Sequence, residues 1–239
     1  MAQATKPSVE ATPDRKQTLS RELVLSTALA LLDAEGLEAL TMRRLGQELG
    51  RDPMSLYRYA KSRTALLDGV TELVLNERTI FPEDPDWQGQ LRRIAHDIRL
   101  IALRHPNVVP LLVTRPLSTP MGLRPVGTLR PLEQILDLLI EAGFAPSDAL
   151  HVYRAFYGFL YGHILNELQE FIVDPDEDEA LLRLGLHRLP AKEFPRLRAL
   201  APLLADYDGE AELEEGITIL LAGLSARLTG PATPTPAQP

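Results

Sequence analysis

Histidine and carboxylate side chains are the groups in this 239-residue chain that could carry out acid–base chemistry or bind a metal ion. The five histidines are scattered, and the chain has no HExxH motif, no nucleophile elbow and no glycine-rich phosphate loop. His163 and Glu167 are four residues apart, so on a helix they would share one face and could bind a metal. A structural histidine at a subunit interface accounts for this pair better than a catalytic one. We therefore predict that the protein is not an enzyme and uses no cofactor or metal site.

A different chemistry is concentrated between residues 43 and 63, where arginine, lysine, serine and tyrosine side chains recur. Arginine can donate two hydrogen bonds to the edge of a guanine base, so we predict that Arg58 reads DNA bases. Pro53, Met54 and Ser55 would shape the same base contact through apolar or hydroxyl groups. The residues predicted to bind DNA phosphates, which position a protein without specifying sequence, are Arg43, Tyr57, Tyr59, Lys61 and Arg63.

The local sequence predicts two short helices that would hold these side chains. Thr41 is a good N-cap for the first helix, and Gly50 can adopt the left-handed conformation that a sharp turn after it needs. Asp52 would cap the second helix, which begins at Pro53, where a missing N–H has no consequence. Two short helices around a tight turn, the second of them outwardly polar and basic, indicate a helix-turn-helix. In this motif the second helix enters the major groove of DNA.

This part of the chain resembles the N-terminal domain of the TetR family of transcriptional repressors. The resemblance is carried, in chain order, by Gly36, the run LTMRRL from Leu40, LG at Leu49, SLYRY from Ser55 and KSR from Lys61. It implies an all-α fold. Three N-terminal helices would form the helix-turn-helix DNA-binding domain, and a larger helical C-terminal domain would bind a ligand and dimerise.

The remainder of the chain has the pattern of further helices, without strands or internal repeats. Flanking the helix-turn-helix, helices are predicted at about 20–35 and 63–79; beyond it they are predicted at about 87–105, 107–112, 126–142, 146–171, 191–204 and 209–228. This stretch resembles the C-terminal domain of the tetracycline-repressor-like branch, through Trp87, TRP from Thr114 and AGF from Ala142. In that branch two helices of each subunit form a four-helix bundle. The resemblance implies a homodimer with close helix contacts at Gly158, Gly162, Gly216 and Gly223.

The distribution of charge favours a basic DNA-binding head on an acidic body. From residue 15 to 63, nine Lys/Arg stand against six Asp/Glu, a net charge of +3, whereas the whole chain carries −8. We expect a disordered tail at 1–18, the helix-turn-helix domain at 19–64, the ligand-binding and dimerisation domain at 65–228, and a second disordered tail at 229–239. Cysteine is absent and no apolar run reaches the length of a membrane span, so a cytoplasmic protein with no membrane contact is expected.

An apolar body interrupted by a few polar groups suits a largely apolar small-molecule effector. The residues predicted to contact it are Thr79, Trp87, Ile94, Ile98, Leu111, Ile135, Tyr153, Arg154 and Tyr157, although any one of them taken singly is better explained as a core residue. Arg154 is expected to anchor an anionic ligand. In drug-binding members of the branch, histidine, asparagine and glutamine side chains contact magnesium and tetracycline; the matching positions here are Thr79, Ile94, Leu111 and Ile135. Because these positions depart from the pattern of that branch, binding of magnesium–tetracycline is not expected.

These observations favour a sequence-specific transcriptional repressor that a small molecule releases from double-stranded operator DNA of palindromic sequence. Activation instead of repression, a DNA-binding regulator without an effector, and a helical enzyme or adaptor that retains the fold remain alternatives. The helix that begins at Arg63 is expected to be the only regular element that contacts both halves of the protein. It would therefore transmit ligand binding to the DNA-binding head.

Overall fold

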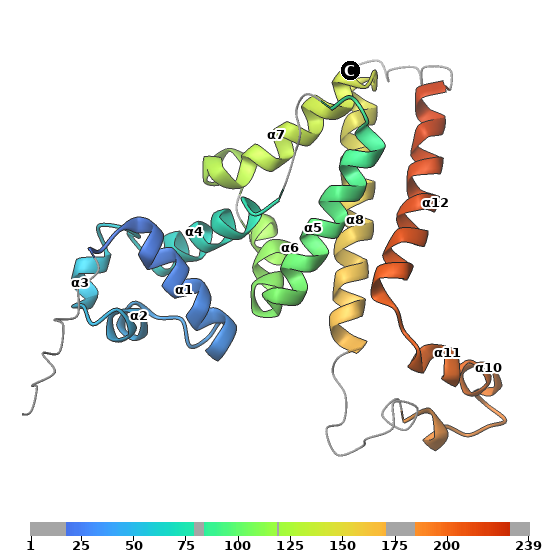
Figure 1. The fold of residues 1–239 in the computed structure, drawn as a ribbon, viewed down its shortest axis with the longest axis horizontal. Helices are drawn as coiled ribbons and strands as arrows, with labels where there is room; N and C mark the ends of the chain where they lie inside the picture. Colours follow the sequence, from blue (N-terminus) through green and yellow to red (C-terminus); the bar gives the residue numbers. More distant parts are fainter. Residues whose placement is uncertain (1–17, 79–83, 119, 171–184, 230–239) are drawn as a thin grey trace, which may run out of the picture.

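The computed structural model describes residues 18–78, 84–118, 120–170 and 185–229, and in these parts every regular element is a helix (Figure 1). The head consists of α1 (Arg21–Glu35), α2 (Met42–Glu48) and α3 (Pro53–Leu56), and α4 (Arg63–Leu75) connects it to the body. The body consists of α5 (Trp87–Arg104), η1 (Pro106–Val108), α6 (Val109–Ser118), η2 (Met121–Leu123), α7 (Val126–Glu141), α8 (Pro146–Glu170), η3 (Leu186–Arg188), α10 (Pro195–Ala199), α11 (Ala201–Ala205) and α12 (Gly209–Thr229). The predicted all-α class is confirmed. No described helix is both long and apolar enough to cross a membrane.

Side-chain caps fix where the helices of the head begin. Ser20 and Thr41 each accept a hydrogen bond from the backbone N–H three residues later, at 3.1 and 3.0 Å. Asp52 accepts one from the N–H of Met54 at 2.7 Å. Between α2 and α3, Gly50 has a φ of +59°, in the left-handed region that favours glycine. The predicted caps at Thr41 and Asp52, the turn and the helix-turn-helix are therefore confirmed.

Two predicted helix ends are wrong. α4 ends at Leu75, earlier than the expected end near Thr79, which itself lies outside the described residues. α6 continues to Ser118, well beyond the expected end at Leu112. Pro110 does not prevent this helix, because it lies in the first turn, where a backbone N–H has no partner within the helix.

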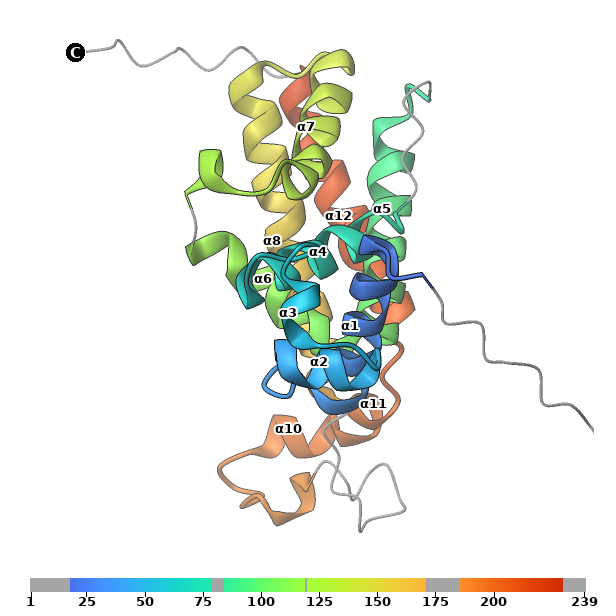
Figure 2. The same ribbon diagram turned by 90° about the vertical axis from the view of Figure 1, so that its left-hand side faces the viewer.

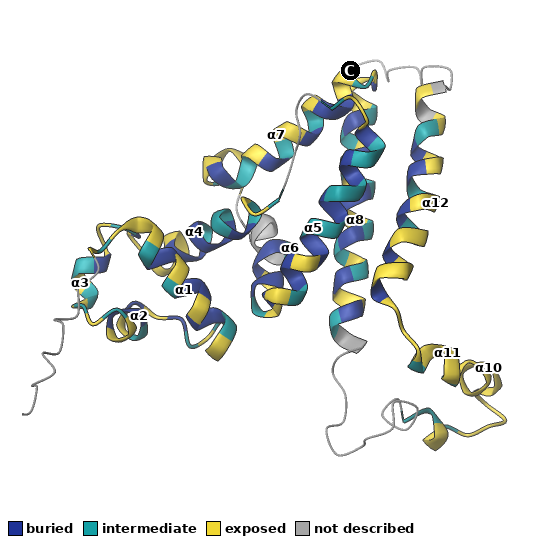
Figure 3. Cartoon of the chain, in the orientation of Figure 1, coloured by how far each residue is buried: buried dark blue, intermediate teal, exposed yellow. Residues whose placement is uncertain are grey.

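The single helix expected at 191–204 is instead two short helices, α10 and α11. Pro202 has no N–H to donate to the carbonyl of Arg198, so the helix is interrupted before it and restarts with the proline in the first turn. Figures 1 to 3 show α10 and α11 lying beyond the N-terminal end of α12 and largely exposed. The acidic stretch at 174–179 and nearly all of the two predicted tails lie outside the described residues.

Two hydrophobic clusters hold the described helices together. The first, which we call the head cluster, joins buried residues of α1 to α4 with Ile101 of α5 and with Val108, Leu111 and Leu112 of η1 and α6. The second, the body cluster, packs α5, α7, α8 and α12 around side chains such as Phe156, which is fully buried. Elements of the body therefore contribute directly to the core of the head.

A polar contact also joins α1 to the body. The side-chain amide of Asn107 in η1 donates to the carbonyls of Leu32 and Asp33, at 3.0 and 3.3 Å. Nearby, Nδ1 of His105 lies 2.7 Å from Oδ2 of Asp33. Asn107 thus caps the last turn of α1 from the body, where the carbonyl of Leu32 also accepts from the N–H of Gly36 at 2.9 Å. The expectation that α4 alone contacts both halves is therefore wrong.

Candidate functional site

α3 presents its long and polar side chains to the outside, and a single leucine anchors it. Leu56 is fully buried, whereas Met54 and Tyr57 are 74% and 41% exposed and Arg58 is also exposed. Ser55 is half-buried, and its hydroxyl donates to a backbone carbonyl of the same turn at 2.6 Å. The helix thus has the inner and outer faces that a reader of the major groove requires.

Arg58 is positioned by its neighbour in the chain. Its guanidinium lies over the ring of Tyr59, with 4.6 Å from Cζ to the ring centroid, and it donates a hydrogen bond to the hydroxyl of Tyr59. That hydroxyl in turn donates to the carbonyl of Leu19 at 2.6 Å. Tyr59 was predicted to bind phosphate; in this structure its hydroxyl links Arg58 to the segment before α1.

Arg63 has a structural role that the sequence did not indicate. Its Nε donates to the carbonyl of Leu40 at 2.8 Å, and its Nη2 donates to the carbonyl of Leu37 at 2.6 Å. Both carbonyls lie between α1 and α2, so this arginine holds that segment against the start of α4. Of the other predicted DNA contacts, Arg43 and Lys61 are exposed and Pro53 is half-buried.

Gly46 in α2 is a further structural residue of the head, and it was not predicted from the sequence. A Cβ at this position would lie 2.9 Å from the carbonyl oxygen of Arg51 and 3.1 Å from Cγ of Pro53. The N–H of Arg51 also donates to the carbonyl of Gly46 at 2.9 Å. The absence of a side chain therefore allows α2 and the start of α3 to approach closely. A glycine inside a predicted helix was the available signal.

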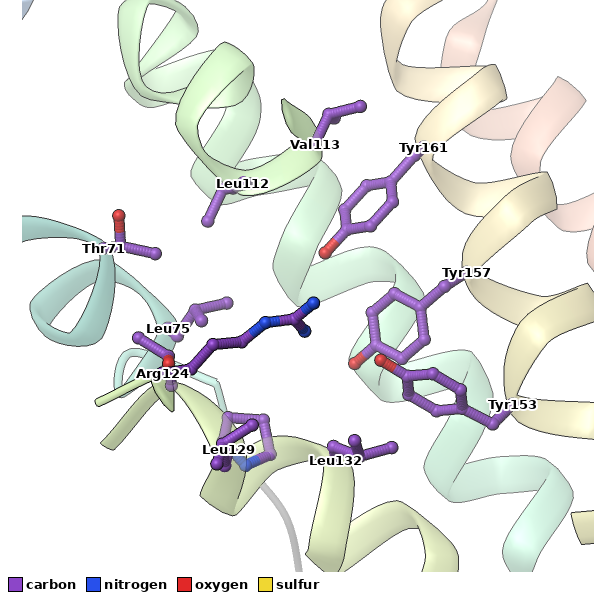
Figure 4. Close-up of a pocket in the computed structure, with 12 residues that line it drawn as sticks. Thr71, Leu75, Leu112, Val113, Arg124, Leu129, Leu132, Tyr153, Tyr157 and Tyr161 are labelled. Carbon is purple, nitrogen blue, oxygen red and sulfur yellow. The ribbon is translucent and has the colours of Figure 1, made fainter. Parts of the chain in front are cut away.

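A cavity of about 290 Å³ opens between α4, α6, α7 and α8, close to the head (Figure 4). Its walls are mostly apolar side chains and three tyrosines: Leu75, Leu112, Val113, Leu129, Pro131, Leu132, Tyr153, Tyr157 and Tyr161. Thr71, Thr128 and Arg124 add polar groups. An apolar cavity with a few converging polar groups is the usual form of a small-molecule site, and this one is near the lower limit of the usual size.

The three tyrosines form a continuous row on α8, because residues four apart share one helix face. The ring centroids of Tyr153 and Tyr157 are 4.8 Å apart, and those of Tyr157 and Tyr161 are 5.4 Å apart. Burial raises the pKa of Tyr157 to about 12 and also raises the pKa values of Tyr153 and Tyr161. Arg78 donates to the hydroxyl of Tyr157 at 3.4 Å. At neutral pH the row therefore offers neutral phenols that can donate or accept hydrogen bonds.

Two family models match this chain. Residues 24–70 match the model described as bacterial regulatory proteins, tetR family, and residues 81–228 match the tetracyclin repressor-like C-terminal domain. The chain belongs to the TetR family. It carries both the DNA-binding and the C-terminal domain of these regulators, in the expected order.

Individual TetR-family proteins are similar over most of their length. The class C tetracycline repressor of Escherichia coli is 30% identical over 216 residues, which cover 88% of this chain and 93% of that protein. A transcriptional repressor of Streptomyces coeruleorubidus is 30% identical over 218 residues, covering 90% of this chain and 72% of the repressor. The crystal structure of ActR from Streptomyces coelicolor in complex with actinorhodin has a TM-score of 0.70 and 30% identity, covering 89% and 99% of the two chains.

Only some of the residues predicted for the effector site line the cavity. Tyr153 and Tyr157 line the cavity. Four others belong to the body cluster and are at most 8% exposed: Trp87, Ile94, Ile98 and Ile135. Leu111 is buried in the head cluster, and Thr79 lies outside the described residues. Arg154 is exposed and does not line the cavity; the arginine that does is Arg124.

Several cavity residues were not predicted from the sequence, for different reasons. Tyr161 continues the spacing of four from Tyr153 and Tyr157, so the pattern was visible in the sequence. Arg124 lies in a proline-rich segment without periodicity, between η2 and α7, where nothing local indicates which way a side chain points. Its place in the cavity depends on the packing of several helices, which a single sequence does not show.

The four glycines predicted for a TetR-type subunit interface differ from one another. A Cβ on Gly216 of α12 would lie 2.5 Å from Cζ of Phe159 on α8, so this glycine allows close packing within one subunit. Gly158, Gly162 and Gly223 are exposed, and a Cβ on any of them would meet no atom within 4 Å. They leave open faces on α8 and α12, the two helices predicted to form the dimer.

We expect Tyr157→Phe to reduce the loss of stability at alkaline pH. The pKa of Tyr157 is about 12 in the folded chain against 10.0 for an exposed tyrosine, so folding favours the protonated phenol. Its contribution to stability is complete below pH 10 and is lost as the pH rises toward 12, at about 1.4 kcal/mol per pH unit. Urea unfolding between about pH 9 and 11 should show a steeper decline for the wild type than for the variant. Equal slopes would contradict the assignment.

Proposed function

We propose that this TetR-family protein is a homodimeric transcriptional repressor that a small molecule, bound in the cavity, releases from a palindromic operator. The observation that carries the proposal is the position of Leu112 in α6, which is buried in the head cluster and also lines the cavity. Leu75, at the end of α4, likewise packs against the head cluster and lines the cavity. A ligand that shifts these helices must therefore alter the packing of the DNA-binding head.

The relatives support this function. Several carry the name repressor, and ActR, which has a similar fold, was crystallised with actinorhodin. TetR-family regulators are generally transcription factors and not enzymes. A small-molecule effector for this chain follows from the same combination of a helix-turn-helix and a body that contains a cavity.

A homodimer is supported by the outer faces of α8 and α12. Leu165 and Ile219 are exposed on them, at 37% and 66%, beside the open glycine positions described above. A two-fold dimer would place two copies of α3 in successive major grooves, with half-sites about 34–36 Å apart or a multiple of this distance. Release requires the effector to bind the DNA-incompetent arrangement more tightly than the DNA-bound one. A coupling free energy of about 1–3 kcal/mol would be typical.

We expect Arg58→Ala to lower affinity for the operator about 10- to 100-fold while changing affinity for random DNA much less. This corresponds to about 1–3 kcal/mol for a lost arginine–guanine contact. The operator is first identified by selecting bound duplexes from a random pool with the wild-type protein. Fluorescence anisotropy then gives the affinity of each protein for the selected duplex and for a scrambled one.

Lys61→Ala is the matched control, because Lys61 is exposed and is predicted to contact phosphate. It should weaken binding to both duplexes. It should also reduce the slope of log affinity against log salt concentration by about one, because one phosphate contact is lost. If Arg58→Ala weakens both duplexes equally, base reading by Arg58 is wrong. If the wild type selects no sequence from the pool, the proposed function fails.

A further inference from the structure

Glu72 of α4 lies where the cavity wall and the DNA-binding head come close together. Its side chain is 23% exposed, and Oε2 lies 3.2 Å from Nη2 of Arg21, the first residue of α1. The same side chain fills the space that a Cβ on Gly127, in the first turn of α7, would need: Cγ of Glu72 would be 2.6 Å from that Cβ, and the carboxylate closer still. Figure 1 shows α4 lying between α1 and α7. One side chain of α4 therefore contacts both neighbouring helices.

The contact between Glu72 and Gly127 borders the cavity. Thr71, the residue before Glu72, and Thr128, the residue after Gly127, both line it. Gly127 itself is buried. Because packed interiors leave little free space, a change in the spacing of α4 and α7 must change the room available to the Glu72 carboxylate. The position of this side chain thus depends on the cavity wall.

The contact between Glu72 and Arg21 lies beside a close crossing of α1 and α4. A Cβ on Gly69 of α4, one helical turn before Glu72, would lie 2.6 Å from Cδ2 of Leu25 and 3.5 Å from Nη2 of Arg21. Leu25 is buried in the head cluster, which also holds Leu56 of α3. The guanidinium that Glu72 binds is therefore next to the packing that sets how the head sits on α4.

We propose that Glu72 is a positioning residue that transmits the spacing of α4 and α7 to α1, and so connects the cavity wall to the orientation of the DNA-binding head. The inference rests on the proposed function and adds a polar connection to the apolar ones through Leu75 and Leu112. A change in the position of α7 displaces the carboxylate from Arg21, and α1 then shifts against α4. A partly exposed ion pair contributes little to stability, so its loss moves the head without unfolding it.

Gly127→Ala tests this without any ligand, because the added Cβ takes the place of the Glu72 carboxylate. Fluorescence anisotropy on the selected operator duplex should show an affinity about 3- to 30-fold below that of the wild type. Glu72→Gln keeps the shape of the side chain but removes its charge, and it should lower the affinity within the same range. Gly122→Ala is the matched control: a Cβ there would meet no described atom within 4 Å, so operator affinity should not change.

The double variant Glu72→Ala/Gly127→Ala shows whether the two residues act through one contact. Its operator affinity should be within about threefold of that of Glu72→Ala alone, because no carboxylate remains for the new Cβ to displace. Losses that multiply in the double variant would overturn the proposal. Should Gly127→Ala alone fail to fold, the double variant should recover folding, and its failure to do so would overturn the proposed contact.

Urea unfolding of the same variants separates positioning from simple stabilisation. An ion pair with only a structural role would lower the free energy of unfolding while leaving the operator affinity of the folded protein unchanged. Unchanged operator binding by Glu72→Gln, or by folded Gly127→Ala, would refute the inference alone. A wild type that selects no operator would refute the proposed function, and this inference with it.

Discussion

Glu167→Ala is expected to destabilise the protein by about 3–5 kcal/mol, because it leaves a buried arginine without its main partner. Glu167 of α8 is 2% exposed and Arg99 of α5 is 9% exposed. Nε of Arg99 donates to both carboxylate oxygens, at 2.9 and 3.1 Å, and Nη2 donates to Oε1 at 2.6 Å. The hydrogen bonds to Glu167 raise the pKa of Arg99, and this effect is lost with the carboxylate. The guanidinium nevertheless stays charged, because arginine is not deprotonated in proteins. A second carboxylate near it, Glu210 of α12, is 3.7 Å away and mostly exposed.

Glu214→Ala is the matched control for this substitution. Glu214 lies on α12 and pairs with Arg92 and His96 of α5, so it also links two helices. Its side chain, however, is 48% exposed. Exposed ion pairs contribute at most about 1 kcal/mol, so this variant should unfold close to the wild type. Urea unfolding followed by circular dichroism, at one protein concentration, gives both values. A similarly small loss of unfolding free energy in the two variants would contradict this prediction. It would show that, without Glu167, the Arg99 guanidinium is hydrated or pairs with Glu210.

The same ion pair shows what spacing within a sequence could not predict. His163 and Glu167 are indeed one helical turn apart, as a metal-binding or proton-transfer pair would be. The partner that decides the role of Glu167 is Arg99, which is 68 residues away in the chain. With three hydrogen bonds from one guanidinium, the carboxylate is held as a structural link between α5 and α8. Nothing near Glu167 in the sequence indicated that arginine.

Local chemistry, by contrast, was readable from the sequence. The caps at Thr41 and Asp52 depend on hydrogen bonds to residues three and two positions away, so residue type and order predict them. The turn at Gly50 is equally local. The cavity is not local: its walls come from α4, α6, α7 and α8, and its arginine comes from a segment with no periodic pattern. Apolar side chains were predicted to face inward, but their division between core and cavity wall needed the helix packing.

Ile135→Ala tests whether this apolar side chain belongs to the core or to the cavity wall. It is expected to destabilise the protein by about 2–5 kcal/mol. Ile135 was predicted to lie in the effector site, but it is completely buried in the body cluster and does not line the cavity. Truncation there removes packed methyl and methylene groups and leaves a void in the core. The free energy of unfolding should fall, while the affinity of the cavity for a small aromatic probe, 2-naphthamide, stays within about threefold of the wild type, since no cavity contact is lost.

Leu132→Ala is the appropriate comparison, because Leu132 lies on the same helix, is half-buried and lines the cavity. Its loss should be less destabilising than that of Ile135, since part of its surface already faces open space. It should weaken binding of 2-naphthamide, because Leu132 is part of the apolar wall that contacts the ring of the probe. The opposite pattern, with Ile135→Ala weakening ligand binding more than Leu132→Ala at little loss of stability, would return Ile135 to the effector site. It would also mean that the ligand-bound protein opens a cavity deeper into the body cluster than the one seen here.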